Sequence, residues 1–162
     1  MTIQKVVKNV KDILAICSNI IESAEKEVLW LVPSVMLFYA STYGLNKQEK
    51  MFIQKGGFVR GITDISYSYI DAVRERLDMG EEVRHYGQYE GMIFLVGDNS
   101  ESISSISIDP DVLLFDGPAT AFWSDDATYT EYLSSIFETA WERAIPATQR
   151  IAELLKEGPP DF

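Results

Sequence analysis

A short apolar run near the start of the chain constrains the fold most. Glu27-Val-Leu-Trp-Leu-Val32 places five apolar residues in succession, and Pro33-Ser34 ends the run. A strand with one face in water alternates apolar and polar residues, so an uninterrupted run indicates a strand buried on both faces. Such strands occur in parallel sheets covered by helices, and the run therefore predicts an α/β fold.

The segment before this run predicts an amphipathic helix. Apolar residues recur every three or four positions over residues 6–24, as on one face of a helix. The other side carries charged residues: Lys5, Lys8, Lys11 and Asp12. Because the apolar stripe is close to a heptad repeat, two interpretations stay open. The helix packs against a second copy of itself, or it lies on the sheet of its own domain.

Helices and strands alternate after the run. We expect a helix from Ser34, which can cap it, to about Lys55, where Gly56-Gly57 closes it. The next elements are a strand, a helix ended by Gly80 and a strand: Phe58–Ile62, Ser66–Met79 and Glu82–Tyr86. The order α-β-α-β-α-β implies parallel strands joined by right-handed crossovers.

The pattern changes in the second half of the chain. Four short apolar runs are separated by turn residues: Met92–Val96, Ser102–Ile108, Val112–Phe115 and Thr120–Trp123. Connections this short cannot hold crossover helices, so these strands should pair mostly antiparallel. A long helix is expected from about Asp126, capped either by Thr128 with Glu131 or by Asp125 and Asp126, and Pro146 kinks or restarts it. Residues 1–162 are therefore expected to form one α/β domain with a mixed sheet.

Charge and composition exclude several classes of protein. Fourteen Lys and Arg against 25 Asp and Glu give a net charge of −11, which opposes binding to nucleic acid or to an anionic membrane. An aromatic content of 12% is core material and excludes intrinsic disorder. The single cysteine, Cys17, and the absence of a targeting or membrane-spanning segment predict a cytoplasmic protein.

Common catalytic and cofactor motifs are absent. The sequence has no Gly-rich phosphate loop and no Gly-x-Ser-x-Gly elbow, so we expect no cofactor. Cys17 falls on the apolar stripe, which favours a buried structural thiol over a Cys17–His85 dyad. Carboxylates at turns and helix starts could bind a divalent cation, but capping and turn roles are the favoured interpretation and no metal site is expected. They are Asp98, Asp109, Asp111, Asp125 and Asp126.

Four stretches of the sequence together carry a resemblance to a known family: Glu27–Ser34, Gly57–Thr63, Ala121–Asp126 and Phe137-Glu-x-x-Trp-Glu-x-Ala-Ile-Pro-Ala147. They resemble, in this order, the first strand, the second strand, and the closing strand and helix of the phospholipase D-like regulatory domains of TrmB-type transcriptional regulators. The resemblance implies a phospholipase D-like half-domain with a mixed sheet flanked by helices. Its order would be helix-βαβαβ, a β-meander and a long C-terminal helix.

Enzymes of that superfamily carry His-x-Lys-x4-Asp, followed by Gly-Ser-x-Asn. The His attacks phosphorus, while Lys and Asn hold the phosphate oxygens. Aligned on Asp98, this chain has Gly91 at the His position and Ile93 at the Lys position, and residues 105–108 lack the Gly and the Asn. An alignment on His85 restores neither the Lys nor the Asp. The resemblance therefore implies a noncatalytic member, and we expect no catalytic residue.

A ligand pocket in such a fold should lie at the carboxyl ends of the parallel strands. Six residues are predicted to line it: Arg60, Thr63, Arg84, His85, Tyr86 and Trp123. A strand arginine can bind a carboxylate or a phosphate, but an ion pair with one of the 25 acidic residues is the favoured alternative. His85 could titrate near neutral pH or have no such role. Tyr86 and Trp123 could contact a ligand or simply pack.

The function predicted from the sequence is a noncatalytic regulatory or sensory domain. It would form a homodimer and bind a small ligand or a protein partner, such as a DNA-binding regulator or a kinase, without touching nucleic acid or membrane itself. The alternative is a hydrolase or phosphodiesterase with a divergent site built from Asp98, Asp125, Asp126 or His85.

Overall fold

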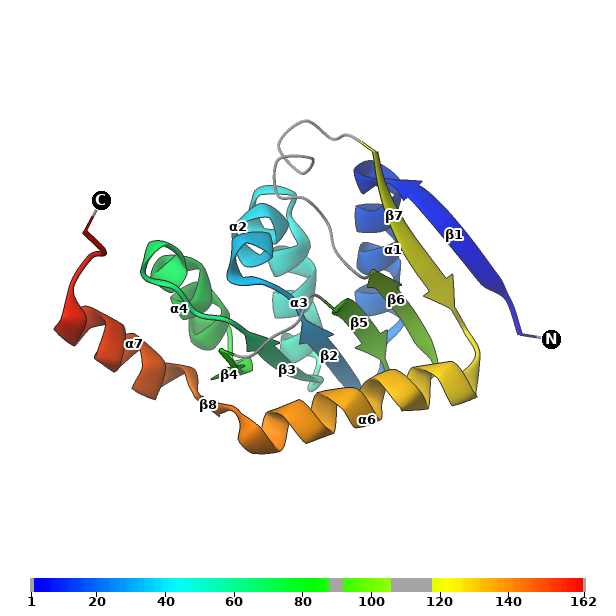
Figure 1. Cartoon of the computed structure of the whole chain (residues 1–162). Coiled ribbons are helices and arrows are strands. Elements are labelled where there is room, and N and C mark those ends of the chain that lie inside the picture. The colour runs from blue at the N-terminus through cyan, green and yellow to red at the C-terminus, as the bar shows by residue number, and fades with distance from the viewer. Residues whose placement is uncertain (1, 88–91, 106–117, 162) are drawn as a thin grey trace.

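The fold is built on one mixed β-sheet (Figure 1). The computed structural model describes residues 2–87, 92–105 and 118–161, and in this part the strand order is β1-β7-β6-β5-β2-β3-β4-β8. The strands are β1 Gln4–Asn9, β2 Glu27–Leu31, β3 Phe58–Thr63, β4 Glu82–His85, β5 Ile93–Gly97, β6 Glu101–Ser105, β7 Pro118–Ser124 and β8 Ile145–Pro146.

Strand directions agree with the pattern of the sequence. β2, β3 and β4 are parallel, and β5, β6 and β7 join them in antiparallel pairs. The predicted parallel half and the predicted antiparallel half therefore meet at the pairing of β2 with β5. The strand expected over Val112–Phe115 lies outside the described residues, as does the end of the one expected over Ser102–Ile108.

Helices cover both faces of the sheet (Figure 1). They are α1 Val10–Ser23, α2 Ser34–Thr42, α3 Leu45–Gln54, α4 Ile70–Asp78, α6 Ala127–Arg143 and α7 Ala147–Glu157, with a 3-10 turn, η1, over Tyr67–Tyr69. α6 runs across one face, and α1 to α4 lie on the other. None of the described helices is both long and apolar enough to cross a membrane.

The helix expected over residues 6–24 is wrong at its start. Residues 4–9 form β1, which pairs antiparallel with β7, so the fold opens with a strand rather than a helix. Val6 points outward and is 59% exposed, whereas Val10, the first residue of α1, is 1% exposed. Asn9 caps α1 by accepting a hydrogen bond from Asp12 N at 2.9 Å. The apolar stripe of α1 is buried within its own domain, as one of the two interpretations held.

The helix expected over residues 34–55 is two helices. Gly44 has φ +88°, a left-handed conformation that glycine adopts at little cost, and it separates α2 from α3. Ser34 is the first residue of α2 rather than its cap, since Pro33 holds the cap position without a side-chain hydrogen bond.

The predicted helices at 66–79 and after Asp126 also differ in detail. The first begins as the 3-10 turn η1 and becomes α-helical only at Ile70. Asp126, one of the two predicted caps, accepts from Thr128 N at 2.8 Å. Pro146 lies in β8, paired with Arg84 of β4, and it also holds the N-cap position of α7, so a new helix starts directly after it, as one of the two predicted outcomes held. A proline is compatible with this position because β8 is an edge strand of the sheet.

Candidate functional site

The six residues predicted to line a ligand site lie in different parts of the molecule. Thr63 and His85 are paired on neighbouring strands, but Trp123 is on β7, separated from β3 by β6, β5 and β2. At about 4.8 Å per strand, Trp123 on β7 is about 19 Å from β3 and about 24 Å from β4, which carries Arg84 and His85. The structure does not assemble the predicted site.

Arg60 is held by ion pairs and aromatic rings on the α6 face. Its Nε lies 3.3 Å from the Glu27 carboxylate, and its Nη2 contacts Glu138. The guanidinium carbon is 5.2 Å from the ring centroids of both Phe137 and Trp141. Burial lowers the pKa of Arg60, but hydrogen bonds to Glu138 and Glu27 outweigh burial and raise it. The ion-pair interpretation is confirmed for this arginine.

Arg84 and Tyr86 also face α6. Arg84 donates to the carbonyl of Trp141 at 2.8 Å, and its guanidinium lies 4.1 Å from the indole centroid. Its described partners are thus a carbonyl and a ring, not the expected carboxylate. Tyr86 packs against the core beneath α6, and its N–H donates to the carbonyl of Thr63.

His85 and Thr63 point to the opposite side. The N–H of Ile65 donates to Nδ1 of His85 at 2.9 Å, which requires that nitrogen to be unprotonated. Burial and the charge of Arg150 lower the pKa of His85, with Asp64 and Glu153 acting against them. The imidazole therefore holds the loop after β3 rather than facing a pocket, and Thr63 is fully buried.

Trp123 packs on the α1 side near the edge of the sheet. Its Nε1 donates to Glu101 at 3.1 Å, and Lys5 Nζ lies 5.3 Å from its ring.

Asp98, the residue on which the enzyme motif aligns, binds backbone. It accepts from the N–H groups of Glu25, Lys26 and Glu27 at 2.7, 2.9 and 2.8 Å. Burial raises the pKa of Asp98, but these three hydrogen bonds outweigh burial and lower it. Asp98 thus fixes the entry to β2, a structural role.

The remaining acidic candidates bind backbone N–H groups where they are described, and one of them is a helix cap. Asp125 accepts from Ile3 N, and Asp126 caps α6. Asp109 and Asp111 lie outside the described residues. In the described part of the chain, no three His, Cys, Asp or Glu side chains gather as metal ligands would.

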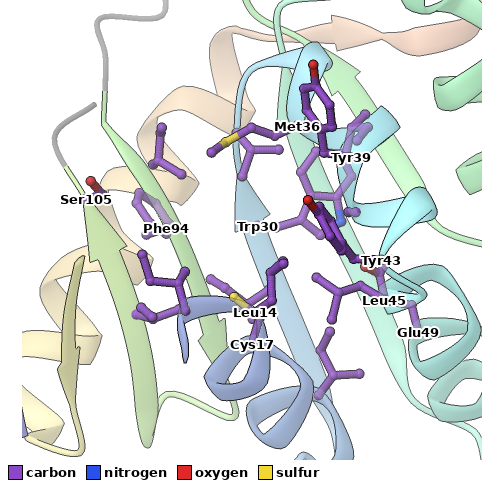
Figure 2. A pocket seen from close by; sticks show the side chains of 18 of the residues that line it. Leu14, Cys17, Trp30, Met36, Tyr39, Tyr43, Leu45, Glu49, Phe94 and Ser105 are labelled. Carbon is purple, nitrogen blue, oxygen red and sulfur yellow. The ribbon is translucent and has the colours of Figure 1, made fainter. Parts of the chain in front are cut away.

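The structure has an apolar pocket elsewhere, on the face covered by α1 to α4. It has a volume of about 120 Å³ and lies between α1, the α2–α3 pair and strands β2, β5 and β6. Figure 2 shows Trp30 at the back, Phe94 on one side, Tyr39 and Tyr43 on the other, and Leu14 and Cys17 below. Its lining residues include Val10, Ile13, Leu14, Cys17, Ile21, Trp30, Met36, Leu37, Tyr39, Ala40, Tyr43, Leu45, Glu49, Arg76, Ile93, Phe94, Leu95 and Ile103.

A glycine positions the back wall of the pocket. Trp30 and Gly61 are register partners on β2 and β3, and a Cβ at Gly61 would lie 2.0 Å from the indole ring. The absence of a side chain at position 61 therefore lets the indole lie across β3. In this position Nε1 of Trp30 donates to Glu81 at 2.7 Å.

A buried charge cluster adjoins the pocket. Arg76 is fully buried, lies 3.1 Å from Glu49 and 3.9 Å from Glu81, and also donates to the carbonyl of Leu37. Burial raises the pKa of Glu81 well above 4.5, and the neighbouring Glu49 adds to the rise. One cation thus faces two carboxyls, of which Glu81 keeps its proton to higher pH than a free carboxyl does.

Cys17 lines the pocket on α1. Burial, followed by the charge of Glu49, raises the pKa of the thiol to about 12. The thiol is therefore a poor nucleophile at neutral pH. His85 hydrogen bonds to the backbone after β3, so the structural interpretation of Cys17 is favoured over the dyad.

The pocket can bind an apolar molecule but offers no reactive group. Sequence reasoning missed this site because its lining comes from scattered apolar residues. The one available signal was Arg76, which follows Ile70 and Val73 at helical spacing and so belongs to the buried face of α4.

Comparison with known proteins identifies the fold. The chain has the phospholipase D-like fold, shared with Nuc of Salmonella typhimurium, a phospholipase D family member (TM-score 0.71, 13% identity, 90% of this chain and 98% of that one). NucT from Helicobacter pylori is similar at a TM-score of 0.72 and 12% identity, over 90% of this chain and 99% of that one.

The same fold occurs in TrmBL2, an archaeal chromatin protein that shows a novel mode of DNA binding. The TM-score is 0.67 at 17% identity, over 88% of this chain and 53% of that one. This chain thus spans about half the length of TrmBL2. No protein-family model matches the sequence, and no curated protein matches it.

Proposed function

We propose that residues 1–162 form a single noncatalytic domain with a regulatory or sensory role in signalling or transcription control, and that a small ligand binds in the apolar pocket. The observation that carries this proposal is the pocket, a cavity of about 120 Å³ beside a charge cluster whose members pair with one another. Concave apolar sites with few polar groups are typical of small-molecule binding.

The candidate catalytic groups support a noncatalytic role. Asp98, Asp125, Asp126 and His85 each accept a hydrogen bond from a backbone N–H. A nucleophile or general base needs its lone pair directed at the substrate. Ile93, at the position where the enzymes have Lys, is buried at the start of β5.

A homodimer is the proposed assembly, with a DNA-binding regulator or a kinase as a further partner. TrmBL2 binds DNA, but this chain matches 53% of its length, and a net charge of −11 opposes contact with a phosphate backbone. Direct binding to nucleic acid or membrane is therefore not part of the proposal. The single cysteine favours a reducing, cytoplasmic compartment.

Two measurements test this proposal. Size-exclusion chromatography with light scattering should show a dimer, and a monomer at every concentration would remove the homodimer. The wild type should not hydrolyse bis(p-nitrophenyl) phosphate. Hydrolysis that is lost in both His85→Ala and Asp98→Asn, with folding confirmed by circular dichroism, would overturn the noncatalytic assignment.

A further inference from the structure

We infer that the pocket takes a small, uncharged, apolar molecule of about the size of benzene or toluene. This inference rests on the proposed sensory function and adds to it the chemical class of the ligand. It follows from the charge, the volume and the chemistry of the pocket walls.

Charge balance excludes an ionic ligand. The charged side chains lining the pocket are Glu49 and Arg76, and they lie 3.1 Å from each other. Arg76 also faces Glu81 and the carbonyl of Leu37, so this cation is already shared among acceptors. An anion entering the pocket would find its one cation, Arg76, already shared, and a cation would meet carboxyls that Arg76 and the retained proton of Glu81 already neutralise, so burial of either ion is unfavourable.

Volume sets the size of the ligand. An engineered apolar cavity of about 150 Å³ lined by Leu, Ile and Phe stays dry and binds benzene. The present cavity of about 120 Å³ has similar walls, with Ile13, Leu14, Leu37 and Phe94 among its lining. A molecule of about six or seven non-hydrogen atoms therefore fills this space.

The side chains that line the pocket also predict that a ligand binds noncovalently and reversibly. Cys17 is the nucleophilic side chain of the pocket that reacts most readily as a thiolate, and its pKa of about 12 keeps it a thiol at neutral pH. The indole of Trp30 lines the pocket and lies against Gly61 of β3. Flat aromatic molecules therefore have an aromatic side chain to pack against in the pocket.

A matched set of probes tests the inference on the full chain. Toluene, benzylammonium and benzoate differ in charge, and ethylbenzene and propylbenzene, which are uncharged and have as many non-hydrogen atoms as benzylammonium and benzoate, control for size. Binding is measured by saturation-transfer NMR and by the shift in Tm. We expect toluene to bind with a Kd on the order of 1 mM or below. Benzoate and benzylammonium should bind at least tenfold more weakly.

Two substitutions locate the site. Ala40→Leu fills the pocket from α2 and should weaken toluene binding at least tenfold, whereas Ala15→Leu makes the same change at an exposed position of α1 and should leave binding unchanged. If Ala40→Leu does not fold, Cys17→Leu fills the pocket from the other side.

The outcomes separate this inference from the proposed function. Tight binding of benzoate or benzylammonium that Ala40→Leu abolishes would overturn the ligand class and leave the sensory function standing. Binding of no probe, or toluene binding equal in Ala40→Leu and the wild type, would overturn both the class and the pocket.

Discussion

Arginine side chains on the two faces of the sheet differ in their burial and in their partners. On the α6 face, Arg60 and Arg84 lie against Trp141, and the side chain of Arg60 keeps 20% of its surface exposed. On the opposite face, the side chain of Arg76 is 1% exposed and lies among Glu49 and Glu81. An arginine at the border of the core keeps part of its hydration, whereas a buried one depends on its partners.

Packing differs between the faces as well. One long helix covers the α6 face, where the rings of Phe137 and Trp141 stack with centroids 5.5 Å apart. Several shorter helices cover the other face, and the pocket lies where α1 and the α2–α3 pair meet over the sheet. A face assembled from separate helices thus leaves a space that one continuous helix fills.

The largest expected effect on stability comes from substituting the buried Arg76, and the same substitution at Arg60 is its control. Arg76→Met should cost about 3–5 kcal/mol of the free energy of unfolding, because Glu49 is left buried without its cation. Arg60→Met should cost about 1 kcal/mol, because Glu27 and Glu138 are exposed enough to be hydrated. Urea denaturation measures both. Equal losses of unfolding free energy in the two variants would show that arginine contributes equally to stability on both faces.

A smaller effect is expected from Glu81→Gln, which keeps an acceptor for Trp30 and removes the titrating proton. Because the pKa of Glu81 is raised on folding, the wild type should lose stability as pH rises above about 4.5, by up to about 1.4 kcal/mol per pH unit. We expect the variant to be about 1–2 kcal/mol more stable than the wild type at pH 8. Urea denaturation from pH 4 to pH 8 checks this, and parallel curves for the two proteins would contradict it.

Filling the pocket should have a modest stabilising effect. Ala40→Leu is expected to add about 0.5–1 kcal/mol by occupying empty volume, while the exposed Ala15→Leu should change stability little. Thermal unfolding without ligand measures both variants. A large loss in Ala40→Leu would mean that the space is already filled by side chains.

The smallest effect concerns His85. Its pKa is lowered on folding, so the stability that the neutral imidazole contributes is present above about pH 6.5 and is lost as pH falls below it. His85→Asn offers an acceptor to Ile65 N that does not titrate. The wild type should lose about 0.5 kcal/mol relative to this variant between pH 7 and pH 5, a small value because the imidazole is partly hydrated. Urea denaturation at the two pH values measures the difference, and an equal change in the two proteins would contradict the prediction.

Much of the fold could be predicted because its central elements follow regular patterns. The run at β2 and the spacing of the next two strands indicated the parallel half, and short connections indicated the antiparallel half. The errors lie where tertiary pairing overrides local pattern. Residues 4–9 form the strand β1 because they pair with the edge of β7. The apolar spacing of Val6 and Val10 is equally compatible with a helix.

The site was less predictable than the fold. Charges in strands drew attention to Arg60 and Arg84, and one of the two has the expected carboxylate partners. A pocket formed by Leu14, Ala40 and Ile103 has no local signature, because its lining comes from elements that meet only in three dimensions. The carboxyl ends of the parallel strands are where related folds bind ligands, and the sequence therefore pointed to His85. In this chain His85 instead accepts a hydrogen bond from the backbone N–H of Ile65.

The pairing of β1 with β7 has a consequence for the order of folding. The amide of Ile3 donates to Asp125, 122 positions along the chain, and Val6 is the register partner of Phe122. Contacts of such separation carry a large loop-closure cost and form late. We therefore expect β1 to be among the last of the described strands to pair. Hydrogen exchange should therefore be faster for the backbone amides of β1 than for those of the central strands.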